Sequence, residues 1–249
     1  MICALLIGRE GSQGFPWKNL HPVLGRPLMA YPLMAARKAR TVERIYLSTD
    51  SESIQRVGLQ YGARILNRPP ELATADALGE EVFAHGYRAI EKEAGPVEAL
   101  VLLFCNAPMV TGELIDQGVE VLRRRPDVDS AVSVSRYNMW SPLRARRLNG
   151  GGFLQPFVPF KTFGDPSTLN CDRDSQGDVF YADMGVSVVR PRCLENLQAG
   201  LLPQKWMGQK IHPLKQWGGL DVDFEWQLPQ VEFWLKANGI QPAEETVPR

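Results

Sequence analysis

Residues 2–19 read ICALLIGREGSQGFPWKN, and this stretch decides the fold. The apolar run Ile2–Ile7 is continuous, which is typical of a strand covered on both faces of a sheet. Three glycines follow at a spacing of three residues, namely Gly8, Gly11 and Gly14. Glycines let backbone N–H groups approach a ligand closely, and Arg9 and Lys18 supply positive charge for phosphate oxygens. The stretch therefore predicts a strand that leads into a phosphate-binding loop.

Two common phosphate-binding motifs do not match this loop. The dinucleotide fingerprint requires G-x-G-x-x-G, whereas the spacing here is G-x-x-G-x-x-G. A P-loop requires Lys after its second glycine, whereas Phe15 follows Gly14. On spacing alone, an ordinary glycine turn after a strand remains an alternative.

The loop resembles the N-terminal signature of the cytidylyltransferases that activate acidic sugars. These are the CMP-sialate, CMP-legionaminate and CMP-pseudaminate synthetases and, more distantly, the CMP-Kdo synthetases. Their pattern is a strand followed by A-R-x-x-S-K-G-[IL]-P-x-K-N. The matching positions in this chain are Arg9, Ser12, Gly14, Pro16, Lys18 and Asn19. The chain departs at Gly8, where the family has Ala, and at Gln13, where the family has Lys, so one cation of the loop is lost.

Strand and helix signals alternate through the rest of the first half. The expected strands are Arg44–Asp50, Ala63–Leu66, Ala99–Phe104 and Ser130–Ser135. The expected helices are Pro27–Ala39, Ser51–Tyr61, Gly79–Glu93 and Gly112–Arg125, and a further helix, Phe224–Ala237, closes the chain. Strands that alternate with helices predict an α/β fold with a mostly parallel sheet. The resemblance implies a Rossmann-like, glycosyltransferase-A-like nucleotidyltransferase sheet.

Residues 137–178 interrupt this alternation. They are rich in Pro, Gly, Asn and Asp, and Leu148–Leu154 reads as a hairpin with a glycine-rich turn. A long unstructured segment inside a compact domain would be unusual, which favours a small lobe over a surface loop. In the family resembled, a lobe at this position reaches across to a second subunit. We therefore expect a nucleotidyltransferase domain over 1–240, an inserted dimerisation and capping lobe over 137–178, a tail over 241–249, and a homodimer.

The composition restricts the partners and the compartment. Among 249 residues, 28 Lys and Arg balance 28 Asp and Glu, so the formal net charge is zero. A general basic field is absent, and neither a nucleic-acid nor a membrane partner is expected. The four cysteines form no C-x-x-C pair, so a zinc site is not expected. With no signal-peptide pattern and no apolar run of membrane-spanning length, a cytoplasmic location is expected.

Two further segments fall at the ends of predicted strands, where open parallel sheets bind ligands. Ser48–Asp50 matches an S-T-D sequence of the family, and Asp50 is expected to order the loop and cap a helix. Arg68–Ala73 resembles the family sequence R-P-x-E-L-A, whose Arg contributes to CTP binding. Arg68 is therefore expected to bind nucleotide, and an ion pair with Glu71 is the alternative.

The last such segment contains a pair of acidic residues. Asp221 and Asp223 point the same way if the segment is extended, and two adjacent carboxylates repel each other unless a cation lies between them. Mg²⁺ prefers few protein carboxylates, with water and phosphate oxygens completing its octahedron. The alternative is a strand end at which Asp223 caps the closing helix. The family has D-x-D at this point, where it binds the metal that bridges the triphosphate.

The resemblance implies transfer of CMP from CTP to an acceptor hydroxyl with release of pyrophosphate. CTP and a small acidic acceptor are the expected partners, and Mg²⁺ is the expected cofactor. The expected roles fall in four groups: catalysis by Arg9, Lys18 and Asp223; nucleotide binding by Gly8, Gly11, Ser12, Gly14, Asn19 and Arg68; acceptor binding by Phe104 and Arg173; and metal binding by Asp221 and Asp223. Within this scheme Asn19 helps to read the cytosine.

The acceptor half departs from the family. Sialate-type enzymes have Q-P-T-S-P-L-R where Phe104–Val110 reads FCNAPMV, and only the Pro matches. Their F-R-P-N-G reads YADMG over Tyr181–Gly185, so one of two carboxylate-gripping Arg residues is lost. Arg173 corresponds to the other if one residue is inserted before Gly185. An acidic, nonulosonate-like sugar is the expected acceptor. The alternatives are another acceptor, such as a phosphonate, or a non-catalytic nucleotide-binding relative.

Overall fold

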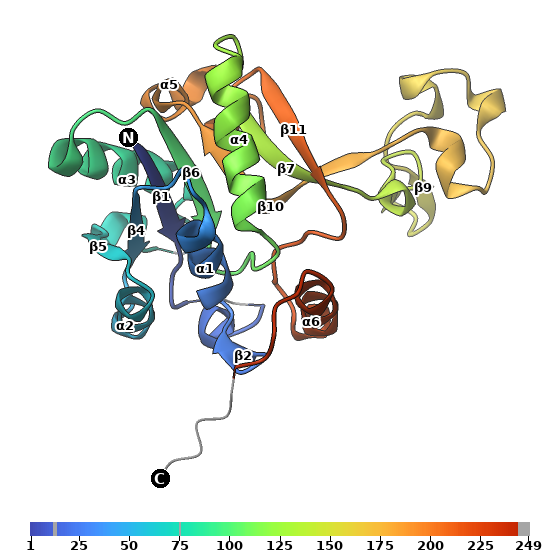
Figure 1. The fold of residues 1–249 in the computed structure, drawn as a ribbon. Coiled ribbons are helices and arrows are strands. Elements are labelled where there is room, and N and C mark those ends of the chain that lie inside the picture. The colour runs from blue at the N-terminus through green and yellow to red at the C-terminus, as the bar shows by residue number, and fades with distance from the viewer. Residues whose placement is uncertain (12–13, 75, 244–249) are drawn as a thin grey trace.

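The computed structural model describes residues 1–11, 14–74 and 76–243 (Figure 1). Its main sheet has seven strands in the order β11-β7-β10-β6-β1-β4-β5. Strand β10 runs antiparallel to its neighbours β6 and β7, and the other neighbouring pairs are parallel. The expected α/β fold with a mostly parallel sheet is confirmed.

The elements alternate along the chain as the sequence predicts. The strands are β1 Ile2–Ile7, β2 Pro22–Val23, β3 Arg26–Pro27, β4 Arg44–Thr49, β5 Arg64–Asn67, β6 Ala99–Phe104, β7 Ser130–Arg136, β8 Arg146–Leu148, β9 Leu154–Pro156, β10 Phe180–Val189 and β11 Ile211–Gln216. The α-helices are α1 Ala30–Lys38, α2 Glu52–Gln60, α3 Gly79–Ala94, α4 Gly112–Arg124, α5 Pro191–Glu195 and α6 Leu228–Ala237. No helix in the described part of the chain has both the length and the apolarity that crossing a membrane requires.

Strand β1 lies inside the sheet and is buried throughout. Its even-numbered residues pack with helices α1, α2 and α4 in one hydrophobic cluster. Its odd-numbered residues pack with helices α3 and α5 in a second cluster on the other face. A strand covered on both faces has no need for polar side chains, which is why β1 reads as a continuous apolar run. The carboxyl end of β1 is thereby fixed beside those of β4 and β6.

Two helices begin later than the sequence suggests. The expected helix Pro27–Ala39 begins at Ala30, because Arg26–Pro27 pairs with Pro22–Val23 in a tight hairpin. Two left-handed residues form its turn, Leu24 with φ 46° and Gly25 with φ 75°. The expected helix Phe224–Ala237 begins at Leu228 and is preceded by a 3₁₀ turn.

Residues 137–178 project from the body of the molecule on the side of β7 and β10, shown in yellow to orange in Figure 1. The predicted hairpin is present, with β8 paired antiparallel to β9. Short 3₁₀ turns make up much of the remainder. The segment is joined to the sheet through Tyr137, whose backbone N–H donates to the carbonyl of Val179 at 2.9 Å. Its role in dimerisation remains a prediction.

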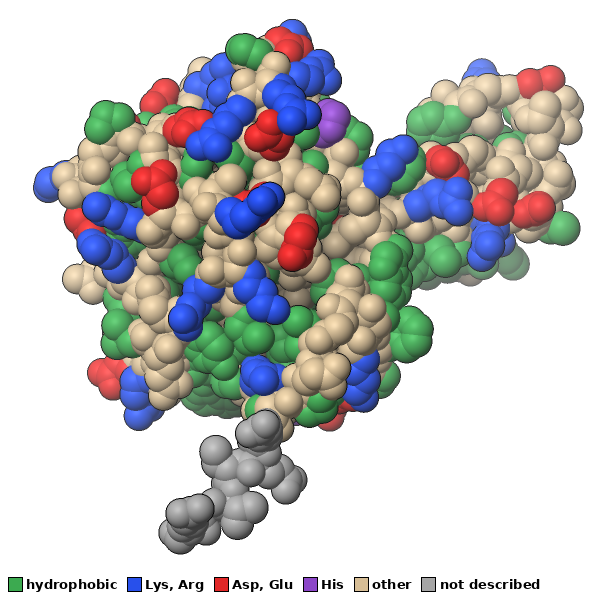
Figure 2. All heavy atoms as spheres, viewed as in Figure 1, with side chains coloured by type: hydrophobic (Ala, Val, Ile, Leu, Met, Phe, Trp, Pro, Cys, Tyr) green, Lys and Arg blue, Asp and Glu red, His purple; other side chains and the backbone are tan. Residues whose placement is uncertain are grey.

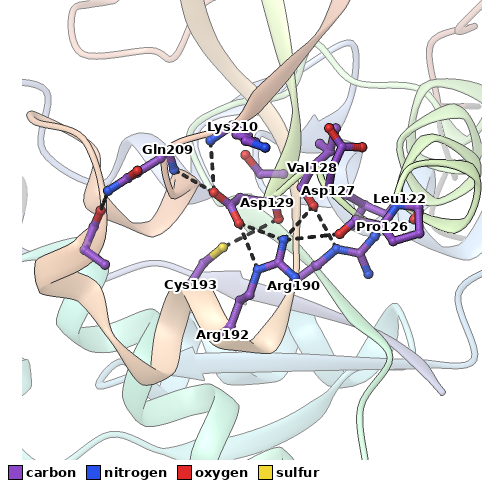
Figure 3. Close-up of polar contacts among 12 residues, drawn as sticks. Leu122, Pro126, Asp127, Val128, Asp129, Arg190, Arg192, Cys193, Gln209 and Lys210 are labelled. Atoms are coloured by element: carbon purple, nitrogen blue, oxygen red, sulfur yellow. Dashed lines mark hydrogen bonds and ion pairs between the residues drawn. The ribbon is translucent and has the colours of Figure 1, made fainter.

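A dense polar cluster surrounds Asp129 at the amino end of β7 (Figure 3). The Asp129 carboxylate accepts hydrogen bonds from Arg192 at 2.8 Å and from the backbone N–H groups of Gln209 and Lys210 at 2.9 Å. Arg190 donates to backbone carbonyls in the last turn of α4 and after it, among them Val128 at 2.8 Å. These contacts join the loop before β7, the end of β10 and the start of β11. Asp129 lies at the amino end of β7, away from the ligand-binding edge, so we assign the cluster a structural role.

Candidate functional site

A cavity of about 370 Å³ opens at the carboxyl ends of β1 and β6. Its wall combines the glycine loop, the segment after β5, the start of α3 and the acidic segment near the C-terminus. The predicted site residues that line it are Gly8, Arg9, Gly14, Lys18, Asn19, Arg68, Phe104 and Asp223. Four segments that are far apart in the sequence therefore meet at the edge where the parallel sheet was expected to bind its ligand.

Of the other four predicted site residues, three do not line the cavity and one cannot be placed. Gly11 is exposed and is not part of the wall, and Ser12 lies outside the described residues. Asp221 lies directly behind the wall, where its carboxylate accepts a hydrogen bond from Asn106 at 3.4 Å. Arg173 lies on the projecting lobe, exposed and 3.6 Å from Asp174. Within one chain, the structure does not bring Arg173 to the cavity.

Lys18 and Asp223 meet across the cavity. The Lys18 ammonium lies 2.6 Å from the Asp223 carboxylate, although 205 positions separate the two residues. The Lys18 side chain is 12% exposed and that of Asp223 is 56% exposed. Trp17 precedes Lys18 with φ 60°, a left-handed conformation that turns the chain into the 3₁₀ turn Lys18–Leu20. The pair is the contact that closes the glycine loop onto the acidic segment.

Asp221 is in an environment that disfavours its charge. Burial, followed by repulsion from Asp223, raises the pKa of the Asp221 carboxyl above its usual range. A divalent cation between the two carboxylates would relieve this repulsion. Among the described residues, no third Asp, Glu, His or Cys joins the pair. Two carboxylates with room for water and phosphate oxygens fit Mg²⁺, which usually binds one or two protein carboxylates.

The acidic segment does not cap the closing helix as the alternative interpretation supposed. The backbone N–H groups of Asp223 and Phe224 both donate to the side-chain oxygen of Gln227, at 2.7 and 2.8 Å. Gln227 thus holds the turn from inside the following helical segment. The Asp223 carboxylate is left facing Lys18 and the cavity.

Asn19 presents a buried hydrogen-bond acceptor without a partner. Its side chain is 6% exposed, and its Nδ2 donates to the Arg9 carbonyl at 3.0 Å. Its Oδ1 is buried and accepts no hydrogen bond within the described part of the chain. A buried acceptor left unpaired costs about 1–3 kcal/mol, so this oxygen in the cavity wall is a candidate acceptor for a hydrogen bond from a ligand.

Two arginines lie on the other side of the cavity. Arg68 donates from Nε to the Ser48 hydroxyl at 3.2 Å and from Nη2 to the Ser48 carbonyl, so it anchors the loop after β4. Burial lowers the pKa of the Arg68 guanidinium relative to its usual value. Arg9 donates to the Thr74 carbonyl at 3.2 Å. The expected alternative for Arg68, an ion pair with Glu71, does not form, because its hydrogen bonds go to Ser48.

The departure from the family at Gly8 has a packing reason. A Cβ at position 8 would lie 2.4 Å from Cys105 Sγ and 2.8 Å from Cys105 Cβ. Cys105 stands where sialate-type enzymes have Pro, and it is fully buried. Burial raises the pKa of its thiol to about 12, so Cys105 acts as a small hydrophobic residue. Gly8 and Cys105 are therefore mutually adapted.

Gly8→Ala is expected to lower the free energy of unfolding by about 1–3 kcal/mol, because the methyl group overpacks the Cys105 contact. Denaturant unfolding measures the effect. Gly11→Ala is the matched control, since no atom of the described residues outside its chain neighbours lies within 4 Å of its added Cβ. In a Cys105→Gly background the alanine at position 8 is expected to cost nothing further. An equal cost in both backgrounds would refute the packing explanation.

Asn106 is a residue of the site that the sequence did not reveal. It lines the cavity, and its Nδ2 donates to the Val222 carbonyl at 3.1 Å as well as to Asp221. Its own carbonyl accepts from the Val222 N–H at 2.8 Å, and Val222 is fully buried. Asn106 thus fastens the centre of the acidic segment to the end of β6. A signal was present in the sequence, because Asn106 is a polar residue that follows a predicted strand. It was overlooked because the segment Phe104–Val110 departs from the family pattern.

Comparison with known proteins gives a family match and several relatives. The family described as "Cytidylyltransferase" matches residues 3–147. The chain is 36% identical over 92% of its length to an N-acylneuraminate cytidylyltransferase of Oncorhynchus mykiss, and the match covers 49% of that protein. It is 40% identical over 61% of its length to a CMP-N,N'-diacetyllegionaminic acid synthase of Legionella pneumophila, covering 65% of that protein. The chain therefore spans about half to two thirds of the length of these curated relatives.

Among solved structures, a similar fold occurs in a CMP:2-keto-3-deoxy-manno-octonic acid synthetase complexed with CTP. The TM-score is 0.68 at 13% identity, and the match covers 95% of this chain and 99% of that one. At this identity the likeness concerns the fold alone.

Proposed function

Because the chain belongs to the cytidylyltransferase family, we propose that it transfers CMP from CTP to a hydroxyl of an acidic sugar and releases pyrophosphate. The main support for the proposal is the set of side chains that line one cavity. Three cationic side chains and Asp223 line one cavity at the carboxyl edge of the sheet, and Asp221 lies directly behind its wall. Asn19 adds a buried amide oxygen that accepts no hydrogen bond from the described residues. The relatives that match the chain act on acidic sugars by their names, which supports the acceptor class.

The reaction requires positioning more than covalent chemistry from the protein. The acceptor hydroxyl attacks the α-phosphorus in line with the departing pyrophosphate, and negative charge spreads over the phosphate oxygens. Arg9 and Lys18 lie on the cavity wall and bind these oxygens in the proposal. Arg68 adds a desolvated positive charge at the same wall, where electrostatic stabilisation is stronger than in water.

Mg²⁺ held by Asp221 and Asp223 would neutralise charge that develops on the triphosphate. The chain's own contribution is to keep these two carboxylates in place. Asn106 fixes the segment between them through Val222. Lys18, which contacts Asp223 at 2.6 Å, would be free to bind the triphosphate if a metal bound Asp223.

The lobe completes the acceptor side in a homodimer. Several of its large apolar side chains are exposed, including Phe153, Leu154, Phe157 and Phe163. Figure 2 shows hydrophobic side chains along the lower side of the projecting lobe. Burying such a surface against a second copy would be favourable, and it would carry Arg173 toward the partner's cavity.

The free cysteines suit a reduced, cytoplasmic compartment.

Nucleotide-dependent thermal stabilisation tests the proposal, and it can be measured before the acceptor is identified. CTP, ATP, GTP and UTP are compared with and without Mg²⁺. At a hundredfold excess over Kd, CTP should add about 2.7 kcal/mol, on the order of 5–10 °C for a chain of this size. Pyrophosphate release is then measured with sialic, legionaminic and phosphonic acids as acceptors. The absence of a CTP-selective shift would contradict the proposal, and release with phosphonates alone would change the acceptor class.

Asn19→Leu is expected to lower the preference for CTP over UTP about tenfold, the effect of one hydrogen bond of about 1.4 kcal/mol. The 4-amino group of cytosine can donate to Asn19 Oδ1, whereas uracil carries an acceptor at the same position. Competitive titration with the two nucleotides measures the ratio. Asn138→Leu is the control, since Asn138 is an equally buried amide in the neck of the lobe. An unchanged CTP:UTP ratio in Asn19→Leu would remove base reading from Asn19.

A further inference from the structure

A buried carboxylate lies behind the candidate site without lining its cavity. Asp183 is 4% exposed, and its hydrogen-bond donors in the described part of the chain are neutral. The hydroxyls of Ser133 and Ser135 donate to its two oxygens at 2.5 and 2.6 Å. Gln216 Nε2 donates at 2.9 Å and the Gly185 N–H at 3.2 Å. A buried charge held by neutral donors alone is stable only if those donors stay in place.

The backbone is irregular where it carries this carboxylate. Strand β10 pairs with β7 at Ala182↔Val134 and again at Ser187↔Val132, so four residues of β10 oppose one residue of β7. Within this bulge Met184 has φ 60°, a left-handed conformation that is rare for a residue with a side chain. Bulges redirect side chains and occur often beside active sites. Here the bulge turns Asp183 toward the end of β11.

The carboxylate reaches the acidic segment through Gly219. The Ser135 hydroxyl that donates to Asp183 also accepts the Gly219 N–H at 2.9 Å. The Tyr137 hydroxyl donates to the Gly219 carbonyl, also at 2.9 Å, so both backbone groups of this residue are held. A Cβ at position 219 would lie 2.4 Å from Asp183 Oδ2, which shows how closely the backbone approaches. Gly219 is two residues before Asp221, the first carboxylate of the acidic pair.

We propose that Asp183 is a positioning residue for the acidic pair. Through the Ser135 hydroxyl, its carboxylate holds Gly219 in place. Gly219 and Asn106 then fix the backbone that presents Asp221 and Asp223 at two points, residue 219 and Val222. This inference rests on the proposed function, in which that pair binds Mg²⁺. Asp183 also aligns Gln216, whose Nε2 donates at the same time to the Met109 carbonyl at 3.1 Å. The Asp183 carboxylate is thereby linked to the segment after β6 through Gln216, and to the acidic segment through Ser135.

Asp183→Asn removes the charge at nearly constant volume. The amide of Asn offers one acceptor oxygen, whereas the carboxylate accepts four hydrogen bonds. If the Asn oxygen takes the place of Oδ1, it still accepts from Ser133 and from the Gly185 N–H, but its NH2 group then faces Ser135 and Gln216 Nε2. The Ser135 hydroxyl can rotate to accept, whereas Gln216 Nε2 can only donate. The opposite orientation of the amide leaves the Gly185 N–H without an acceptor. The network therefore cannot be satisfied in full, and Gly219 is expected to loosen.

Two readouts test the proposal. Amide hydrogen exchange over residues 217–223 is followed in the metal-free protein, and it is expected to accelerate about tenfold or more in Asp183→Asn. The Mg²⁺ concentration that half-saturates stabilisation by CTP is expected to rise about ten- to hundredfold, as when an outer partner of a metal ligand is lost. Binding of CTP without metal is expected to stay the same.

Ser130→Ala is the matched control. Ser130 is fully buried on the same strand as Ser133 and Ser135, and its hydroxyl donates to the Met207 carbonyl at 2.5 Å. The variant loses a buried hydrogen bond at the other end of β7, so it should lower Tm without changing exchange at 217–223 or the Mg²⁺ requirement. If Asp183→Asn behaved as Ser130→Ala does, the positioning role would be overturned.

A second variant covers the case in which Asp183→Asn does not fold. Gly219→Ala keeps Asp183 but places a methyl group against its Oδ2, and it should reproduce the same exchange and Mg²⁺ effects. Neither exchange nor nucleotide binding requires an acceptor. A wild-type protein that released no pyrophosphate with any acceptor would thus contradict the proposed function, whereas unchanged exchange in both variants would contradict the role of Asp183.

Discussion

Asp223→Asn is expected to lower the turnover number about a hundred- to a thousandfold while the fold survives. Removing one preorganised electrostatic contact costs about 3–4 kcal/mol of transition-state stabilisation. The loss of stability should be small, because the Asp223 side chain is 56% exposed and surface ion pairs contribute about 0–1 kcal/mol. Pyrophosphate release at saturating CTP and Mg²⁺ gives the turnover number, and thermal unfolding reports the fold.

Asp127→Asn provides the matched control for this experiment. Asp127 is an exposed carboxylate that pairs with Arg125 at 3.2 Å, and it lies just before β7, at the edge of the sheet away from the cavity. Its replacement removes a similar ion pair and should leave turnover unchanged. An Asp223→Asn enzyme with normal, Mg²⁺-dependent turnover would show that the acidic pair does not hold the metal.

The parts of the site that follow from local spacing could be predicted from the sequence. The glycine loop follows a strand whose continuous apolar run identifies it as central, and the edge at which such a strand ends is fixed by the parallel sheet. Asp221 and Asp223 are also a local pattern. The strands β5 and β6 end at the same edge, which brings Arg68 and Phe104 to the cavity.

The parts that depend on contacts between distant segments could not be predicted. The Lys18–Asp223 ion pair joins the two ends of the chain, and no periodicity reports such a distance. Gly8 reads as a simple departure until Cys105 is seen against it. Asp183 falls in the YADMG departure from the family, and a bulge within an antiparallel strand breaks the alternation that would mark it as buried. In each case tertiary packing, not local pattern, assigns the role.

Lys18→Met is expected to lower kcat/KM for CTP about a hundred- to a thousandfold, the second large effect at this site. The Lys18 side chain is 12% exposed and pairs with Asp223, so it would be free to bind the triphosphate if a metal bound Asp223. The affinity for CTP should fall accordingly, whereas the affinity for CMP, which lacks the outer phosphates, should change little. Calorimetric titration with both nucleotides measures the difference.

The comparison between CTP and CMP separates two roles for the same lysine. If Lys18 served only to neutralise Asp223, its removal would affect both nucleotides equally and would strengthen metal binding by leaving the carboxylate free. If it binds the triphosphate, the loss is confined to CTP even though Asp223 has become more available. Lys236→Met is the control, because Lys236 pairs with Glu232 on α6 at 3.3 Å and does not line the cavity. Equal losses for CTP and CMP would assign Lys18 to the acidic pair alone, and the triphosphate would then depend on Arg9 and Arg68.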